Sequence, residues 1–158
     1  MKALLAALFR AAPLPLARFV IGLFNTRFNI SVVGVFFSPD GKVLILRHVF
    51  RRRYQWGLPA GFLNAGETPA EGAVREVKEE IGLEVEVTRV HAVQPVGPRH
   101  MEVVVVGTVA KDQAMRPNHE IFEGAFVAPD ALPDGMMPSQ AAMVRAARAP
   151  SPVFSSQV

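Results

Sequence analysis

Four of the five glutamates between Gly61 and Leu83 are the residues of this chain best suited to chemistry. Glu67 comes first, and Glu76, Glu79 and Glu80 follow as a cluster. Carboxylates this close repel one another, so at least one tends to hold a proton unless a cation neutralises them. Oxygen ligands in a chain without cysteine favour Mg²⁺, with Mn²⁺ as a substitute, over Zn²⁺. The pattern therefore predicts a metal site that can bind a diphosphate.

A helix starting at Thr68 is predicted to place three of these glutamates on one face. Thr68 is a capping residue, Pro69 suits the first helical position and Glu71 completes a capping box. Gly82 supplies the left-handed residue that commonly ends a helix. The i, i+3 and i+4 spacing of the three glutamates then brings their side chains together. The apolar stripe of this helix is predicted to consist of Ala70, Ala73, Val74, Val77 and Ile81.

The same residues resemble the signature of a known family. Gly61, Glu67, Arg75 and the run from Glu76 to Leu83 match the Nudix hydrolase pattern at every defining position. A solvated acidic helix would not need these fixed offsets. The resemblance implies an α+β (mixed α/β) fold, the Nudix-type α/β/α sandwich with a mixed central sheet, and cleavage of a diphosphate linked to another group.

The resemblance also implies a role for each residue of the motif. Glu79 and Glu80 are expected to be the principal metal ligands, with Glu76 assisting and the carbonyl of Gly61 adding a contact. Arg75 is expected to orient the carboxylates through charge-assisted hydrogen bonds. Glu67 either ligates a metal or holds Arg75.

A further ligand or the general base is expected from outside the motif. Glu120 opens a late strand, where several family members place such a carboxylate, and Glu123 is the competing candidate. His119 is interpreted as a loop residue. The predicted catalytic residues are thus Glu79, Glu76, Arg75 and Glu120, although the motif does not settle which group deprotonates the water.

Substrate selection is predicted to lie in the loops around the motif. Trp56 and Phe62 either stack on a nucleobase or belong to the core. Pro98 resembles a marker of the ADP-ribose-cleaving branch, whereas the tyrosine expected of dinucleoside-polyphosphate hydrolases is missing. The predicted substrate-binding residues, some of which would hold phosphates, are Arg47, Arg51, Arg53, Tyr54 and Arg99.

These observations favour Mg²⁺-dependent hydrolysis of a nucleoside diphosphate linked to another moiety, such as ADP-ribose or a nucleotide sugar. One alternative is a pyrophosphohydrolase acting on RNA 5′ ends or nucleoside triphosphates, supported by the arginine run and Glu120. It would require a single-stranded groove with stacking aromatics. A second alternative is a non-catalytic nucleotide-sensing module, although such modules commonly lose motif residues and this chain has lost none.

The order of predicted elements is mixed. Strands are expected at Ile30–Phe37, Lys42–Arg47, Glu84–Val90, Met101–Val109 and Glu120–Val127, and a closing helix at Ser139–Ala149 with Ser139 as its cap. We predict a Nudix domain over residues 29–149 and a flexible tail over residues 150–158. The chain has 158 residues, half of them apolar, which suits one domain.

The N-terminal residues 1–28 form an apolar, basic extension. Lys2, Arg10, Arg18 and Arg27 are its charges, and no acidic residue precedes Asp40. No apolar run reaches the length of a membrane span, and no clean cleavage site follows the first apolar run. We expect a helix that packs on the sheet or on a second subunit of a homodimer, or that rests weakly on an anionic membrane surface. The expected compartment is the cytoplasm, and the net charge of +3 is too small to predict DNA binding.

Overall fold

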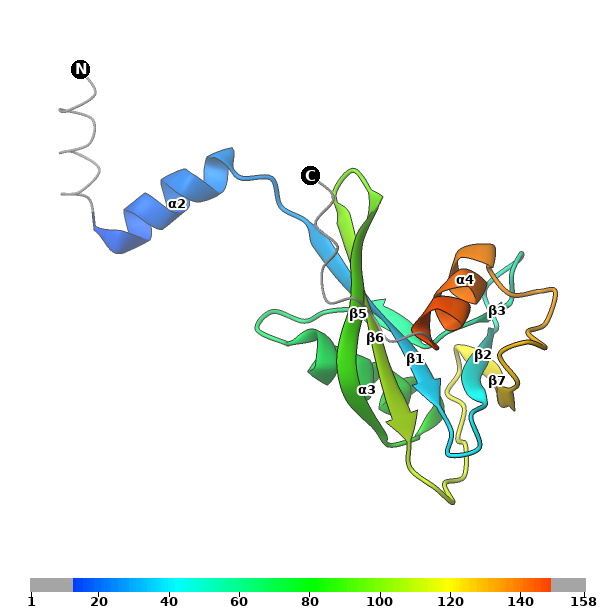
Figure 1. The fold of residues 1–158 in the computed structure, drawn as a ribbon. Helices are drawn as coiled ribbons and strands as arrows, with labels where there is room; N and C mark the ends of the chain where they lie inside the picture. The colour runs from blue at the N-terminus through cyan, green and yellow to red at the C-terminus, as the bar shows by residue number, and fades with distance from the viewer. Residues whose placement is uncertain (1–12, 149–158) are drawn as a thin grey trace.

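A computed structural model describes residues 13–148 of the chain. Three helices and seven strands are defined in this range (Figure 1). The helices are α2 (Leu14–Phe24), α3 (Pro69–Ile81) and α4 (Pro138–Ala147). The strands are β1 (Asn29–Phe37), β2 (Val43–His48), β3 (Trp56–Gly57), β4 (Ala60–Phe62), β5 (Val85–Gly97), β6 (His100–Val109) and β7 (Ile121–Val127).

The strands form one mixed sheet. Its main order is β3-β2-β1-β6-β5, with β4 also paired to β1 and β7 paired to β2. The β1–β6 pair is parallel, from Asn29 opposite His100 to Phe37 opposite Thr108, and the other pairs are antiparallel. The helix α3 lies in the chain between β1 and β6, which a parallel pair requires because a tight turn cannot join its strands.

Alternation along the central strands produces a core on each face of the sheet. Val32 and Phe36 of β1 pack in the cluster that contains Ala73, Val77 and Ile81 of α3. Val33 and Val35 point the other way, into the cluster that contains Val144 and Ala147 of α4. This period of two is what a strand buried on both faces requires. The predicted α/β/α sandwich with a mixed sheet is therefore confirmed.

The predicted ends of α3 are also confirmed. The Thr68 hydroxyl accepts a hydrogen bond from the Glu71 backbone N–H at 3.3 Å, and the Glu71 carboxylate accepts one from the Thr68 backbone N–H at 2.8 Å. Gly82 adopts φ 76°, the left-handed conformation that a residue without Cβ enters freely. These caps fix where the helix that carries the glutamates begins and ends.

The predicted apolar stripe of α3 is partly wrong. Ala73, Val77 and Ile81 are buried, but Ala70 and Val74 are exposed and line an open groove of about 600 Å³ beside β5. Glu80 is buried instead, at 6% exposure. The stripe was assigned from periodicity alone, whereas burial on α3 depends on which neighbouring strand covers each turn.

Two other elements differ from their predictions. The strand expected at Glu84–Val90 continues to Gly97, because β5 is an edge strand and tolerates Pro95. The closing helix begins at Pro138, with Met137 as an N-cap that makes no side-chain hydrogen bond, so Ser139 is not its cap. Pro138 starts this helix because its fixed φ suits the first helical position.

The helix α2 projects away from the sheet (Figure 1), so the expectation that it packs on the sheet is not met. Its side chains Leu14, Leu16, Phe19, Val20 and Ile21 are exposed. The expected tail at 150–158 lies outside the described residues. Among residues 13–148, no helix is long and apolar enough to cross a membrane.

Candidate functional site

Arg75, at the centre of α3, gathers three of the four glutamates. Its Nε donates to Glu67 at 2.8 Å, and its Nη1 donates to Glu76 at 2.8 Å and to Glu79 at 3.2 Å. Its Nη2 donates to the carbonyl of Phe62 at 3.0 Å and to Glu67 at 3.1 Å. One guanidinium thus ties the helix to the loop and to β4, and of the two roles expected for Glu67 the structure displays that of holding Arg75.

The ion pairs around Arg75 shift the pKa of two groups. Hydrogen bonds from Arg75 and from the Asn64 backbone N–H lower the pKa of Glu67 to about 2. The pKa of Arg75 is raised by its hydrogen bond to Glu67 first, and also by Glu76. The ion pair between Glu67 and Arg75 is therefore charged at neutral pH.

Gly61 leaves room for the carboxylate of Glu76. A Cβ at this position would collide with the carboxyl carbon and both oxygens of the Glu76 side chain. Glycine here lets the Glu76 carboxylate pack directly on the backbone of β4, and any larger residue would displace that carboxylate. This contact also places the Gly61 carbonyl in the strand beside the carboxylates.

Glu80 differs from the other glutamates because it is buried and lacks the support of Arg75. It is 6% exposed, and its Oε2 has no hydrogen-bond partner. Burial, and then the nearby Glu76, raise the pKa of Glu80 to about 8, while a backbone hydrogen bond from Ala60 opposes the shift. Without a cation, burial thus favours the protonated form of Glu80.

Metal-free protein is expected to lose stability as the pH rises from 6.5 to 8. The pKa of Glu80 is about 8 when folded and 4.5 as the reference value. The folded state thus binds more protons than the unfolded state across this window, and the free energy of unfolding falls by about 2 kcal/mol between pH 6.5 and 8. Denaturant unfolding in EDTA measures this slope.

The same window isolates Glu80 from His48. Burial and then Arg51 lower the pKa of His48 from 6.5 to about 4, so its contribution has the opposite sign and adds only about 0.4 kcal/mol between pH 6.5 and 8. Glu80→Gln should remove the slope, and the exposed Glu86→Gln should keep it. A slope that persists in Glu80→Gln would show that another group causes it.

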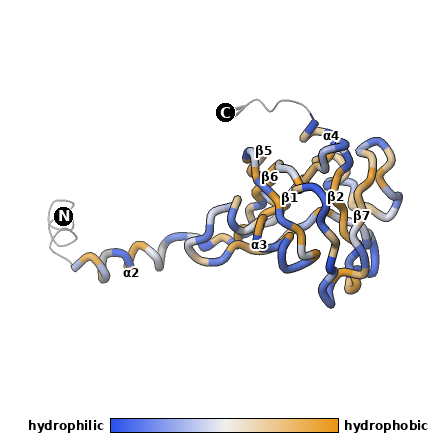
Figure 2. Tube along the Cα trace, turned by 90° about the horizontal axis from the view of Figure 1, so that it is seen from below, coloured by the Kyte–Doolittle hydropathy of each residue, from blue (hydrophilic) through white to orange (hydrophobic). Residues whose placement is uncertain are grey.

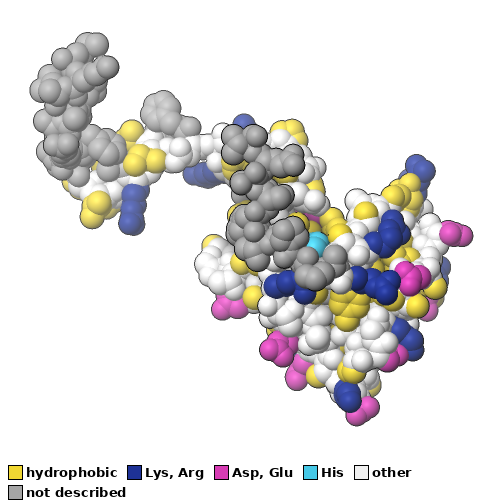
Figure 3. Space-filling model, viewed as in Figure 1, with side chains coloured by type: hydrophobic (Ala, Val, Ile, Leu, Met, Phe, Trp, Pro, Cys, Tyr) yellow, Lys and Arg dark blue, Asp and Glu magenta, His cyan; other side chains and the backbone are white. Residues whose placement is uncertain are grey.

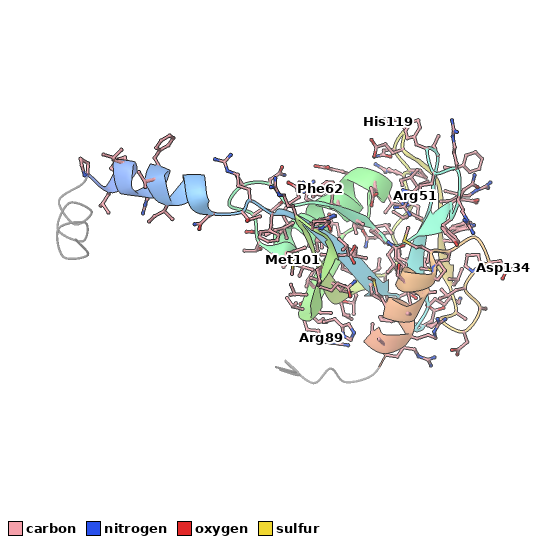
Figure 4. All side chains as sticks on the ribbon, turned by 90° about the horizontal axis from the view of Figure 1, so that it is seen from above. Arg51, Phe62, Arg89, Met101, His119 and Asp134 are labelled. Atoms are coloured by element: carbon pink, nitrogen blue, oxygen red, sulfur yellow. The ribbon has the colours of Figure 1, made fainter. Side chains whose placement is uncertain are left out.

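Arg51 is the residue of the arginine run that turns inward. It is half-buried, its Nη1 is fully shielded and has no hydrogen-bond partner, and burial lowers its pKa while Glu80 opposes that shift. A Cβ on Gly57 would collide with this Nη1 and would lie 2.8 Å from Oε1 of Gln140. Figure 4 shows Arg51 close to α3. Glycine at position 57 thus leaves the space that the guanidinium occupies.

The other predicted substrate-binding residues lie elsewhere or are engaged. Arg47 donates to Glu123 at 3.1 Å and to Gln55 at 3.2 Å, and it stacks over Phe122 at 4.9 Å. Arg53 is exposed and lies 4.9 Å from the ring centre of Tyr54, which has a positive φ of 52°. Arg99 is exposed in the turn between β5 and β6, and Pro98 is the other residue of that turn.

Glu120 lies near the buried glutamate, at the start of β7. Its negative charge contributes to the raised pKa of Glu80, and its own side chain is 57% exposed. Its competitor Glu123 is occupied by Arg47. His119 is 82% exposed beside Glu120, on the surface seen in Figure 4. Of the two carboxylates outside the motif, Glu120 is therefore the one close to the cluster.

Two further buried polar groups lie in this region, and the sequence did not point to one of them, Gln140. His48 Nε2 is buried without a partner, and the Gln140 side chain accepts a hydrogen bond from the Leu58 backbone N–H at 3.0 Å. Gln140 occurs in an apolar helix and carries no motif, so only its 6% exposure reveals it. Of the two aromatic candidates, Trp56 packs on the core, whereas Phe62 is exposed and lies 5.3 Å from the ring of His100.

A family model described as the NUDIX domain matches residues 27–147. The chain belongs to the Nudix hydrolase family. A MutT-like protein of Streptomyces ambofaciens is 32% identical over 68% of this chain and 69% of that protein. The 8-oxo-dGDP phosphatase NUDT18 of Homo sapiens is 40% identical over 46% of this chain, but the match spans only 23% of that protein.

Solved Nudix structures share the fold. An ADP-ribose pyrophosphatase of Streptococcus suis is 27% identical, with a TM-score of 0.61 over 77% of this chain and 92% of that chain. A Nudix hydrolase of Nitrosomonas europaea is 22% identical, with a TM-score of 0.66 over 75% of this chain and 68% of that chain. The second likeness concerns the fold alone.

The Nudix carboxylates supply the oxygen atoms that a divalent cation prefers as ligands, but they are not grouped around one point. Glu80 contributes a shielded oxygen without a partner, and such an atom is costly unless a ligand satisfies it. Within residues 13–148, no three acidic or histidine side chains are close enough together to hold a metal ion. Glu67, Glu76 and Glu79 each pair with Arg75 instead.

Proposed function

We propose that this Nudix hydrolase cleaves the diphosphate linkage of a nucleoside diphosphate joined to another moiety, such as ADP-ribose or a nucleotide sugar. The observation that carries the proposal is the pair of shielded atoms without partners near one another. Neither atom has a hydrogen-bond partner. A cation would satisfy Glu80 Oε2, and an anion would satisfy Arg51 Nη1. A metal ion bound to a phosphate oxygen supplies both, and its charges would satisfy the two groups together.

The residues proposed to hold Mg²⁺, or Mn²⁺ in its place, are Glu76, Glu79 and Glu80 with the carbonyl of Gly61. When bound, the metal polarises the phosphate and lowers the pKa of the attacking water. Arg75 keeps Glu76 and Glu79 in place, and Glu67 in turn holds Arg75 through two hydrogen bonds. Glu67 is therefore proposed as a positioning residue rather than as a ligand.

Glu120 is proposed to accept the proton of the attacking water. It is close enough to raise the pKa of Glu80, yet its side chain is exposed, and within residues 13–148 the contact recorded for its carboxylate is the 3.8 Å one to His119. Water attacks one phosphorus as the bond to the bridging oxygen breaks, and two phosphate-containing products leave. Because little covalent chemistry falls to the protein, positioning and charge stabilisation account for most of the rate.

The substrate class rests on the likeness to known proteins. The Streptococcus suis structure, which this chain covers to 92%, is described as an ADP-ribose pyrophosphatase. Nucleotide substrates of this class are intracellular, which supports work in the cytoplasm. Phe62 lies beside the cluster with its ring exposed and is available for stacking on a base.

A substrate panel with Mg²⁺ tests this function. Wild-type protein and Glu79→Gln are each incubated with ADP-ribose, nucleotide sugars, nucleoside triphosphates, dinucleoside polyphosphates and 5′-triphosphorylated RNA, and phosphate-containing products are measured. We expect turnover of ADP-ribose or a nucleotide sugar that disappears in Glu79→Gln and in EDTA. Turnover only of triphosphates or RNA would assign the pyrophosphohydrolase alternative instead. No metal-dependent turnover by folded protein would support the nucleotide-sensing alternative.

A further inference from the structure

The helix α2 is apolar on almost all of its surface. Its sequence LPLARFVIGLF contains one charged residue, Arg18. Figure 2 shows hydrophobic residues along the helix and its separation from the rest of the domain. In a water-soluble protein a helix of this composition is normally covered, because an apolar surround is typical of buried or membrane-associated helices.

The exposure of its side chains is unusually high. Leu14 is 74%, Phe19 64%, Leu16 52% and Ile21 46% exposed. Figure 3 shows apolar side chains gathered on this helix beside a basic one. Contiguous exposed apolar surface of this kind marks a site of protein or membrane contact. The covering partner must therefore present an apolar surface of its own.

The charges of the N-terminal extension identify the partner as anionic. Lys2, Arg10, Arg18 and Arg27 are its charged residues, and no acidic residue occurs before Asp40. A second copy of this segment would bring the same positive charges, so pairing of two extensions is electrostatically unfavourable. An apolar surface bordered by negative charge is what an anionic lipid bilayer offers.

The length of α2 decides how it would lie. Its 11 residues span roughly 16 Å, about half of a hydrocarbon core of roughly 30 Å. The helix is thus too short to cross and would lie in the interface. Asn25, Thr26, Arg27 and Phe28 link its end to β1, and the first three are polar, so the domain can stay in water.

We propose that residues 1–28 dock this protein on an anionic membrane surface, with α2 embedded by Phe19 and Ile21 and its basic residues at the lipid headgroups. This inference is independent of the proposed hydrolysis. It places the Nudix domain at the membrane through a helix that lies in the interface.

Vesicle co-sedimentation of the full chain tests the docking. Vesicles of equal parts phosphatidylglycerol and phosphatidylcholine are compared with phosphatidylcholine alone, at low and high salt. We expect binding to the anionic vesicles only, weakened by salt. Arg18→Gln with Arg27→Gln should lower the partition coefficient roughly 25-fold, since each cation contributes about fivefold.

Phe19→Ser with Ile21→Ser should abolish binding, and Val90→Ser with Val93→Ser is the matched control. The control removes two valines that are 54% and 55% exposed on β5, and it should bind as wild type does. Thermal melting of each variant checks that the domain remains folded. Equal binding to neutral vesicles, or undiminished binding by the Phe19/Ile21 variant, would overturn the proposal. The proposal would also be overturned if the protein did not bind vesicles and instead formed a dimer that depends on Phe19 and Ile21.

Discussion

Glu80→Gln protein is expected to hydrolyse the substrate found in the panel roughly 10²–10⁴-fold more slowly in kcat than wild type. The buried Glu80 carboxylate has an oxygen that no protein group satisfies, and the proposed function assigns that oxygen to the metal. An amide of the same shape keeps the packing but supplies no charge. Steady-state release of phosphate-containing products at pH 8 and saturating Mg²⁺ measures the loss.

The same substitution should make the metal-free protein more stable at pH 8. Burial disfavours the charged form of Glu80, as its raised pKa of about 8 indicates, and glutamine removes that penalty. Loss of activity together with higher stability cannot come from unfolding. Glu123→Gln is the control. The partially exposed ion pair between Glu123 and Arg47 contributes up to about 1 kcal/mol, so the kcat of this variant should stay within about fivefold of wild type. If Glu80→Gln kept activity within about tenfold of wild type, Glu80 would not be a metal ligand.

Local chemistry explains why the glutamate helix was predicted well. Its start depends on hydrogen bonds between Thr68 and Glu71, and its end on the left-handed conformation of Gly82. These contacts join residues that are close in sequence, so the pattern contains all the information they need. The central strands were predicted for a similar reason, since runs such as Val103–Val106 are buried on both faces.

Tertiary contacts explain what the pattern missed. Val74 and Glu80 both lie on α3, but Val74 faces an open groove beside β5 and Glu80 faces the interior. Helical periodicity shows which residues share a face of α3, but it does not show which face the sheet covers. The second half of β5 was missed because an edge strand accepts Pro95, and β3 and β4 because two or three residues show no period.

The arginine run shows the same limit at the candidate site. From the sequence, Arg51 and Arg53 are predicted equally as phosphate ligands. In the structure Arg51 turns toward Glu80, whereas Arg53 lies on the surface against Tyr54. Arg51 lies in the loop before β3, and the space it occupies is left by the missing side chain of Gly57 in β3. The three consecutive arginines are alike in sequence, and only the packing of Arg51 against Gly57 distinguishes it from the other two.

Arg51→Ala should lower kcat/KM roughly 10–100-fold, mainly through a higher KM, because a hydrogen bond to a charged group contributes about 1.5–3 kcal/mol. The guanidinium is shielded, has an Nη1 without a partner and carries the charge opposite to that of Glu80. A substrate phosphate would give it the partner it lacks. Steady-state kinetics at saturating Mg²⁺ separate this loss from any change in metal affinity.

Arg52→Ala and Arg53→Ala are matched controls from the same run. Both arginines are exposed, so each change should alter KM by less than about threefold. Arg51→Lys should recover only part of the loss, since an ammonium cannot reproduce the planar fork of a guanidinium. Equal losses at positions 51, 52 and 53 would mean that the run acts as a diffuse basic surface. In that case the shielded Nη1 of Arg51 would serve the fold of the loop rather than the substrate.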